Sequence, residues 1–170
     1  MDPNLVVLDP AHGGPDAGAT LGDHLFEKDV TLALALRLRQ ALTAEGFTVL
    51  MTRQADSTNS PSANPPTNDQ RAGIANHAHA LACLVIHATA SGSGVHLYTS
   101  QLQPPQPDAE YPPVDASAFH LVPWDSAQSG FVSQSLLLAG GLRAALVAAN
   151  FPVVVGRQSV QPLDNLISPA

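Results

Sequence analysis

The sequence contains little of what several common protein classes require. Its single cysteine, Cys83, excludes a disulfide within the chain and lies in an apolar run where a buried, unreactive thiol is expected. Only 7 of its 170 residues are lysine or arginine, against 14 aspartates and glutamates, and the basic residues form no cluster. Because anionic partners are bound through basic patches, we expect neither nucleic acid nor an anionic membrane as a partner.

Long hydrophobic runs are also missing. No stretch approaches the roughly 18 apolar residues that a membrane span needs, so we expect no membrane insertion. Residues 1–4 lack the basic region of a signal peptide, and the apolar run that follows them is too short for a signal core. This segment therefore shows no signal peptide, and a domain that works outside the cytoplasm would have its export signal further upstream.

The residues that are present indicate a globular protein. Hydrophobic residues make up 45% of the chain and charged residues 12%, which is a composition that can form a packed core. The length of 170 residues suits one domain, spanning 1–170. The segment 101–128 is rich in proline and long for a connection, so we interpret it as a surface insertion within that domain.

Strand-like and helix-like patterns alternate along the chain. Short apolar runs, typical of buried strands, lie at 5–8, 47–52, 82–87, 95–99 and 151–155, and longer helical patterns lie at 28–45, 70–80 and 131–150. This alternation predicts an α/β fold, in which a mostly parallel twisted sheet is flanked by helices. In the first helix we expect Val30, Leu34 and Leu38 to face the core, with Leu32 and Leu36 on a second buried side.

Three side chains that can bind a metal follow or precede these elements. His12 comes shortly after the first strand, His87 ends the third, and Glu27 stands just before the first helix. Ligands gather at the carboxyl ends of parallel strands, and two imidazoles with one carboxylate are a known set for catalytic zinc. Each residue also has an ordinary interpretation, as a hydrogen-bonded structural histidine or a solvated glutamate, and the pattern alone leaves both open.

Five segments, in this order, resemble the motifs of the zinc-dependent N-acetylmuramoyl-L-alanine amidases of the amidase-3 type. The resemblance covers residues 5 to about 99 closely and the helix at 131–150 more loosely. The segments are Asp9-Pro10-Ala11-His12-Gly13-Gly14-Pro15-Asp16-Ala17-Gly18, Glu27-Lys28-Asp29-Val30, Val49-Leu50-Met51-Thr52-Arg53, Arg71-Ala72-Gly73-Ile74-Ala75-Asn76 and Val85-Ile86-His87-Ala88. The resemblance implies an amidase-3-like fold and hydrolysis of the bond between N-acetylmuramic acid and L-alanine in peptidoglycan.

The resemblance also assigns roles to particular residues. It implies Zn²⁺ as the cofactor, with His12, Glu27 and His87 as its ligands. Asp9 is then interpreted as a carboxylate that orients a ligand histidine, with a cap at the end of the strand as the alternative. Arg53 and Arg71 are expected to brace loops. The implied partner is peptidoglycan and the implied location the cell envelope, periplasmic or secreted, while the oligomeric state stays open.

The resemblance further implies a catalytic glutamate on a late strand, which accepts a proton from the attacking water. Residues 163–170 stop where that strand is expected to begin, so we expect the glutamate beyond Ala170 and a domain truncated at its C-terminal end. Loss of a general base typically lowers the rate about 10²–10⁴-fold, which predicts zinc binding with weak or no hydrolysis. Two alternatives remain: a non-catalytic zinc-containing peptidoglycan-binding module, and a zinc hydrolase of another amide, such as a deacetylase.

Overall fold

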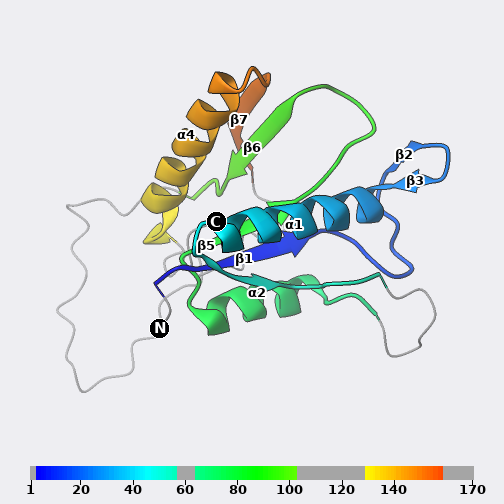
Figure 1. Cartoon of the computed structure of the whole chain (residues 1–170), viewed down its shortest axis with the longest axis horizontal. Helices are drawn as coiled ribbons and strands as arrows, with labels where there is room; N and C mark the ends of the chain where they lie inside the picture. Colours follow the sequence, from blue (N-terminus) through cyan, green and yellow to red (C-terminus); the bar gives the residue numbers. More distant parts are fainter. Residues whose placement is uncertain (1–2, 57–63, 103–128, 159–170) are drawn as a thin grey trace.

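A three-stranded parallel sheet forms the centre of the protein (Figure 1). The structure is a computed structural model that describes residues 3–56, 64–102 and 129–158. Strand β1 (Leu5–Pro10) lies between β4 (Thr48–Met51) and β5 (Ala82–Ile86) and pairs with both in parallel. The prediction of an α/β fold with parallel strands is therefore confirmed.

Two predictions concern segments outside the described residues. Nearly all of the predicted insertion 101–128 lies outside them, and so does the segment 159–170, which ends at Ala170. The catalytic glutamate expected beyond Ala170 therefore stays a prediction. The same holds for the expected truncation of the domain at its C-terminal end.

Two helices cover the opposite faces of this sheet. Helix α1 (Glu27–Ala44) connects β1 to β4, and α2 (Asn68–Ala78) connects β4 to β5 on the far side of β1. The two connections run in opposite directions across the sheet, so right-handed crossovers place the helices on opposite faces. Figure 1 shows α1 and α2 on either side of β1.

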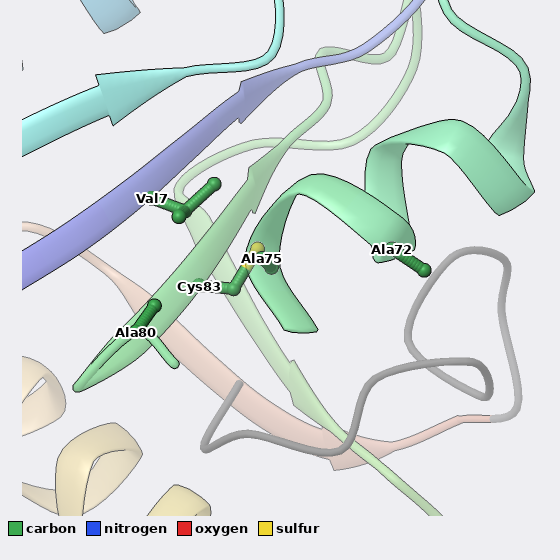
Figure 2. Packing of buried hydrophobic residues seen from close by; sticks show 5 residues of the cluster. All are labelled: Val7, Ala72, Ala75, Ala80 and Cys83. Carbon is green, nitrogen blue, oxygen red and sulfur yellow. The ribbon is translucent and has the colours of Figure 1, made fainter. Parts of the chain in front are cut away.

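Alternation along β1 divides its side chains between two cores. Val7 points toward α2 and packs with Ala72, Ala75, Ala80 and Cys83 (Figure 2). The neighbouring Val6 and Leu8 point to the other face. The core on that side comprises Val6, Leu8, Ala35, Met51 and Ile86, with partly buried leucines of α1 around it. The first strand is thus buried on both faces, as its continuous apolar run predicts.

The face of α1 that meets the sheet differs in part from the prediction. Thr31 and Ala35 are fully buried, whereas Leu34, expected in the core, is 45% exposed. Leu32 and Leu36 pack against the core, as predicted for the second buried side of the helix, and Leu38 packs there too. Leucine recurs at every second position from 32 to 38, and at 100° per residue this places leucines on opposite sides of the helix. The pattern therefore could not select one face.

Two smaller strand pairs complete the described structure. An antiparallel hairpin of β2 (Thr20–Gly22) and β3 (Leu25–Phe26) lies between β1 and α1. Strands β6 (Val95–Thr99) and β7 (Val153–Arg157) pair in parallel, and α4 (Val132–Ala148) packs against both. Among the helices of the described ranges, none is long and apolar enough to cross a membrane.

The register of β1 and β5 determines where the site lies. Pro10 is paired with Ile86, and the backbone nitrogen of Ala11 donates to the carbonyl of Ile86 at 3.1 Å. The two strands therefore end together. The residues that follow them, including His12 and His87, emerge at the same edge of the sheet.

Candidate metal centre

His12, Glu27 and His87 meet at the carboxyl ends of β1 and β5. One ligand atom from each residue can be chosen so that all three lie within 4.8 Å of one another. The Nε2 atom of His12 is 3.1 Å from Oε2 of Glu27, and Nδ1 of His87 is 2.9 Å from Oε1. The two imidazole rings are nearly perpendicular, with centroids 5.4 Å apart. The carboxylate of Glu27 thus lies between the two histidines that the sequence singles out.

Glu27 is held rigidly because its carboxylate accepts two backbone hydrogen bonds. Ala19 donates to Oε2 at 2.9 Å and Ala88 donates to Oε1 at 3.0 Å. Burial of this side chain raises the pKa of the carboxyl, but these two bonds and the bond from His87 outweigh burial and hold the pKa below its usual range. Glu27 is therefore an ionised carboxylate that hydrogen bonds orient in a largely buried position.

The first turn of α1 fixes the loop that surrounds this carboxylate. The first N–H groups of a helix have no partner within the helix, and here two of them donate to the loop. The nitrogen of Glu27 donates to the carbonyl of Ala19 at 2.8 Å, and that of Lys28 donates to the carbonyl of Ala17 at 3.2 Å. Between these carbonyls, Gly18 has φ +66°, and a Cβ atom there would lie 2.6 Å from Cδ2 of His12. The loop therefore passes so close to His12 and Glu27 that residue 18 has no room for a side chain.

His12 is held from its other side by Asp16. The Nδ1 atom of His12 lies 2.8 Å from Oδ2 of Asp16. This hydrogen bond is the main reason why the pKa of the Asp16 carboxyl lies below its ordinary value. Because an ionised carboxylate can only accept, the proton of this bond belongs to His12 Nδ1. In the neutral imidazole, Nε2 then presents a lone pair toward Glu27.

The donor set fits a divalent cation. With the proton of His12 on Nδ1, the lone pair of Nε2 faces an ionised carboxylate oxygen, and two such acceptors repel each other unless a proton or a cation lies between them. Imidazole nitrogen and carboxylate oxygen are also the ligands that zinc accepts in catalytic sites. The three residues can therefore hold a zinc ion.

A cleft of about 420 Å³ opens beside these residues. His12 and His87 lie on its wall, and so do residues of α2 and of the segment before it. The lining residues are Asp9, Ala11, His12, Asp16, Pro65, Pro66, Thr67, Asn68, Arg71, Val85 and His87. The cleft gives a ligand direct access to both histidines.

Comparison with known proteins identifies the family. The family model described as N-acetylmuramoyl-L-alanine amidase matches residues 6–161, which is most of the chain. The chain belongs to this family. A germination-specific N-acetylmuramoyl-L-alanine amidase of Bacillus subtilis is 40% identical over 93 residues, covering 51% of this chain. That alignment spans only 39% of the length of the Bacillus protein.

Solved amidase structures share the fold. The N-acetylmuramyl-L-alanine amidase Ami1 of Mycobacterium smegmatis superposes with a TM-score of 0.68 and 26% identity, over 97% of this chain and 78% of that one. The apo form of Ami1 from Mycobacterium abscessus gives a TM-score of 0.69 at 24% identity, over 99% and 81% of the two chains. The arrangement described above is therefore an amidase fold.

The contacts of Asp9 differ from those expected of it. Its Oδ1 atom accepts hydrogen bonds from Thr52 at 2.5 Å and from Arg71 at 2.6 Å, and neither partner is a histidine. Asp9 lies within β1 and is almost completely buried, so its charge is paired with the nearest buried cation, Arg71. Asp9 is linked to His12 through Arg71, which donates from Nη2 to the carbonyl of His12 at 2.9 Å.

The expectation that two arginines brace loops is confirmed. Arg53 donates to the carbonyls of Pro10, Ala11 and Lys28 at 2.8–2.9 Å. Arg71 donates to the carbonyls of Pro66, Pro10 and His12, in addition to its contact with Asp9. The two guanidinium groups thus tie the end of β1 to α1 and to the start of α2.

The contact of Asp16 with His12 was not predicted from the sequence. Asp16 is part of the quoted motif, and its spacing of four residues from His12 across two glycines was the available signal for a turn that folds back. The ion pair between Lys28 and Asp56, with 2.7 Å between Nζ and Oδ2, was not predicted either. No spacing rule connects residues 28 positions apart, so only the fold could reveal that pair.

Proposed function

We propose that this chain is a zinc-dependent amidase that hydrolyses the bond between N-acetylmuramic acid and L-alanine in peptidoglycan. The observation that carries the proposal is the placement of the Glu27 carboxylate between His12 and His87 in a member of this family. A cleft beside the cluster can admit the substrate. Peptidoglycan as the substrate would place the working protein in the cell envelope, either periplasmic or secreted.

Four residues at the site have a role in this proposal. His12, Glu27 and His87 hold the zinc ion. When bound, zinc supplies Lewis acidity, which polarises the amide carbonyl and lowers the pKa of a bound water to about 7. The backbone bonds to Glu27 keep its carboxylate in place without a change of conformation. Arg71 holds the carbonyl of His12 and so fixes the backbone from which that imidazole projects.

A second candidate is a zinc-containing module that binds peptidoglycan with little or no hydrolysis. A specific observation favours it. In the described part of the chain, the two acids that line the cleft are both engaged, Asp9 with Arg71 and Asp16 with His12. A general base must be free to accept the proton of water, and neither carboxylate meets that condition.

Zinc content and muropeptide cleavage, measured together, test the proposal. The purified chain is loaded with zinc, desalted and assayed for metal and for release of peptide from muropeptides. The variant His87→Ala removes one ligand, and His77→Ala serves as control because His77 is exposed on α2, away from the cleft. We expect one zinc per chain in the parent and control. In His87→Ala we expect the loss of zinc together with whatever cleavage the parent shows.

The outcomes separate the candidates. Zinc with cleavage supports the amidase, and zinc with muropeptide binding but no cleavage supports the binding module. Release of acetate instead of peptide would indicate the deacetylase alternative. Zinc content that is unchanged in His87→Ala would contradict the ligand set itself.

A further inference from the structure

The imidazole of His12 bridges two carboxylates. On one side Nε2 faces Oε2 of Glu27 at 3.1 Å, and on the other side Nδ1 lies 2.8 Å from Oδ2 of Asp16. Asp16 differs from Glu27 in its surroundings, because its side chain is 60% exposed whereas that of Glu27 is 7% exposed. Its contact with His12 is therefore not explained by the packing of a core.

We propose that Asp16 is a positioning residue that fixes the orientation and the protonated nitrogen of His12, so that Nε2 is presented to the metal. This inference rests on the proposed zinc site. A carboxylate that accepts the Nδ1 proton keeps the lone pair on Nε2 and makes that nitrogen a stronger ligand. Asp16 does this without touching the metal position, since its bond is to the far side of the ring.

The backbone around Asp16 is built as a closed turn. The nitrogen of Gly13 donates to the carbonyl of Asp16 at 2.9 Å, and the nitrogen of Asp16 donates back to the carbonyl of Gly13 at 3.1 Å. The nitrogen of Gly18 donates to the other carboxylate oxygen, Oδ1 of Asp16, at 3.1 Å. These three bonds orient the carboxylate, so that Oδ2 is left for His12.

An ion pair from elsewhere in the fold holds this turn. Lys28 donates from Nζ to the carbonyl of Gly14 at 2.8 Å, while Asp56 accepts from the nitrogen of Gly14 at 2.5 Å. The two side chains also pair with each other at 2.7 Å and are mostly buried. Both backbone groups of Gly14 are thus fixed, by α1 on one side and by the loop after β4 on the other. Asp16 is in this way positioned before any metal binds.

The expected effect follows from comparable carboxylate–histidine–metal arrangements. Removal of such a carboxylate typically lowers metal affinity about 10–100-fold. Asp16→Ala removes both the acceptor and the charge, so we expect a loss in that range. Asp16→Asn keeps an acceptor oxygen but removes the charge, so its loss should be smaller. A zinc affinity that decreases in the order Asp, Asn, Ala at position 16 is the result expected of a residue that acts through the imidazole.

The test is the zinc affinity of the full chain, measured by competition with a chromophoric chelator, with cobalt(II) absorption as a spectroscopic readout. Asp23→Asn is the matched control, because it removes the same charge from an exposed residue between β2 and β3. The thermal stability of each metal-free variant is measured alongside. We expect the Asp16 variants to lose zinc affinity in the graded order, with a shifted cobalt spectrum and metal-free stability close to that of the parent. Asp23→Asn should match the parent in all three.

Three results would overturn the inference. Zinc affinities of both Asp16 variants within about twofold of the parent would show that His12 needs no such partner, while the zinc site itself would stand. A loss of affinity accompanied by an equal loss in Asp23→Asn would indicate a general charge effect. Failure of the parent to bind zinc, or unchanged binding in His12→Ala, would instead remove the proposed function and this inference with it.

Discussion

Replacement of Gly18 by alanine should disrupt the proposed metal site without removing any of the three proposed ligands. A Cβ at this position would lie 2.6 Å from Cδ2 of His12 and 2.8 Å from both Cβ and Oε2 of Glu27. These distances are about 0.6–0.8 Å short of the 3.4 Å at which ordinary contact begins. Glu27 cannot move away freely, because backbone nitrogens hold both of its carboxylate oxygens.

Two costs add in this variant. Alanine in the left-handed region at φ +66° costs about 1–2 kcal/mol, and forced overpacking of this kind costs about 1–3 kcal/mol. We therefore expect Gly18→Ala to lose about 2–5 kcal/mol of unfolding free energy in the metal-free protein. Metal–ligand distances in such sites fall within about 0.2 Å of their usual values, so a displaced Glu27 or His12 should also lower the zinc affinity.

Gly46→Ala separates the two costs. Gly46 also has a positive φ, +88°, but a Cβ there meets nothing within 4 Å. This variant should lose only the conformational part, about 1–2 kcal/mol, and should bind zinc as the parent does. Urea unfolding of the metal-free proteins and chelator competition for zinc give the two quantities. Equal stability losses in the two variants, with zinc affinity unchanged in Gly18→Ala, would refute the close approach described for this loop.

Three further predictions concern the surroundings of the site. Arg71→Met leaves the buried charge of Asp9 without its partner and should destabilise the protein by about 3–5 kcal/mol in urea unfolding, with partial recovery when Asp9→Asn is added. Burial raises the pKa of the Asp56 carboxyl, but the hydrogen bonds from Lys28 and from the backbone nitrogen of Gly14 outweigh burial and hold the pKa below its ordinary value. The stability that ionised Asp56 contributes is therefore present above about pH 4 and is lost as pH falls through the lowered pKa. In Asp56→Asn, the free energy of unfolding should therefore fall less steeply as pH is lowered below about pH 4. Burial raises the pKa of the Cys83 thiol, so a thiol reagent at about pH 8 should label it only after unfolding, and rapid labelling of the folded protein would contradict the buried position.

Local patterns in the sequence predicted most of the secondary structure in the described ranges. The run Val95–Thr99 is a strand with the predicted bounds, and the helix predicted at 28–45 is found at Glu27–Ala44. These elements carry strong local signals, namely apolar runs bounded by polar or glycine residues. The order β4-β1-β5 could not be predicted, because parallel pairing depends on contacts between distant segments.

The candidate site could likewise be predicted only in part from the sequence. His12, Glu27 and His87 could be named because histidines at strand ends and the family resemblance pointed to them, and the structure brings them together. The partners of these residues could not be assigned reliably. The contact with His12 that was expected of Asp9 is made by Asp16. Both carboxylates lie within four residues of His12, and only the turn at 13–16 determines which one reaches the ring.

The most direct test of the central claim is the position of zinc in crystals of the loaded protein, located by anomalous scattering at the zinc edge. We predict one site per chain, at about 2.0–2.2 Å from Nε2 of His12, a carboxylate oxygen of Glu27 and Nδ1 of His87. Asp16 should remain bonded to Nδ1 of His12 in that structure. A zinc ion bound by other residues, or no zinc at this position in protein that carries one equivalent, would contradict the account.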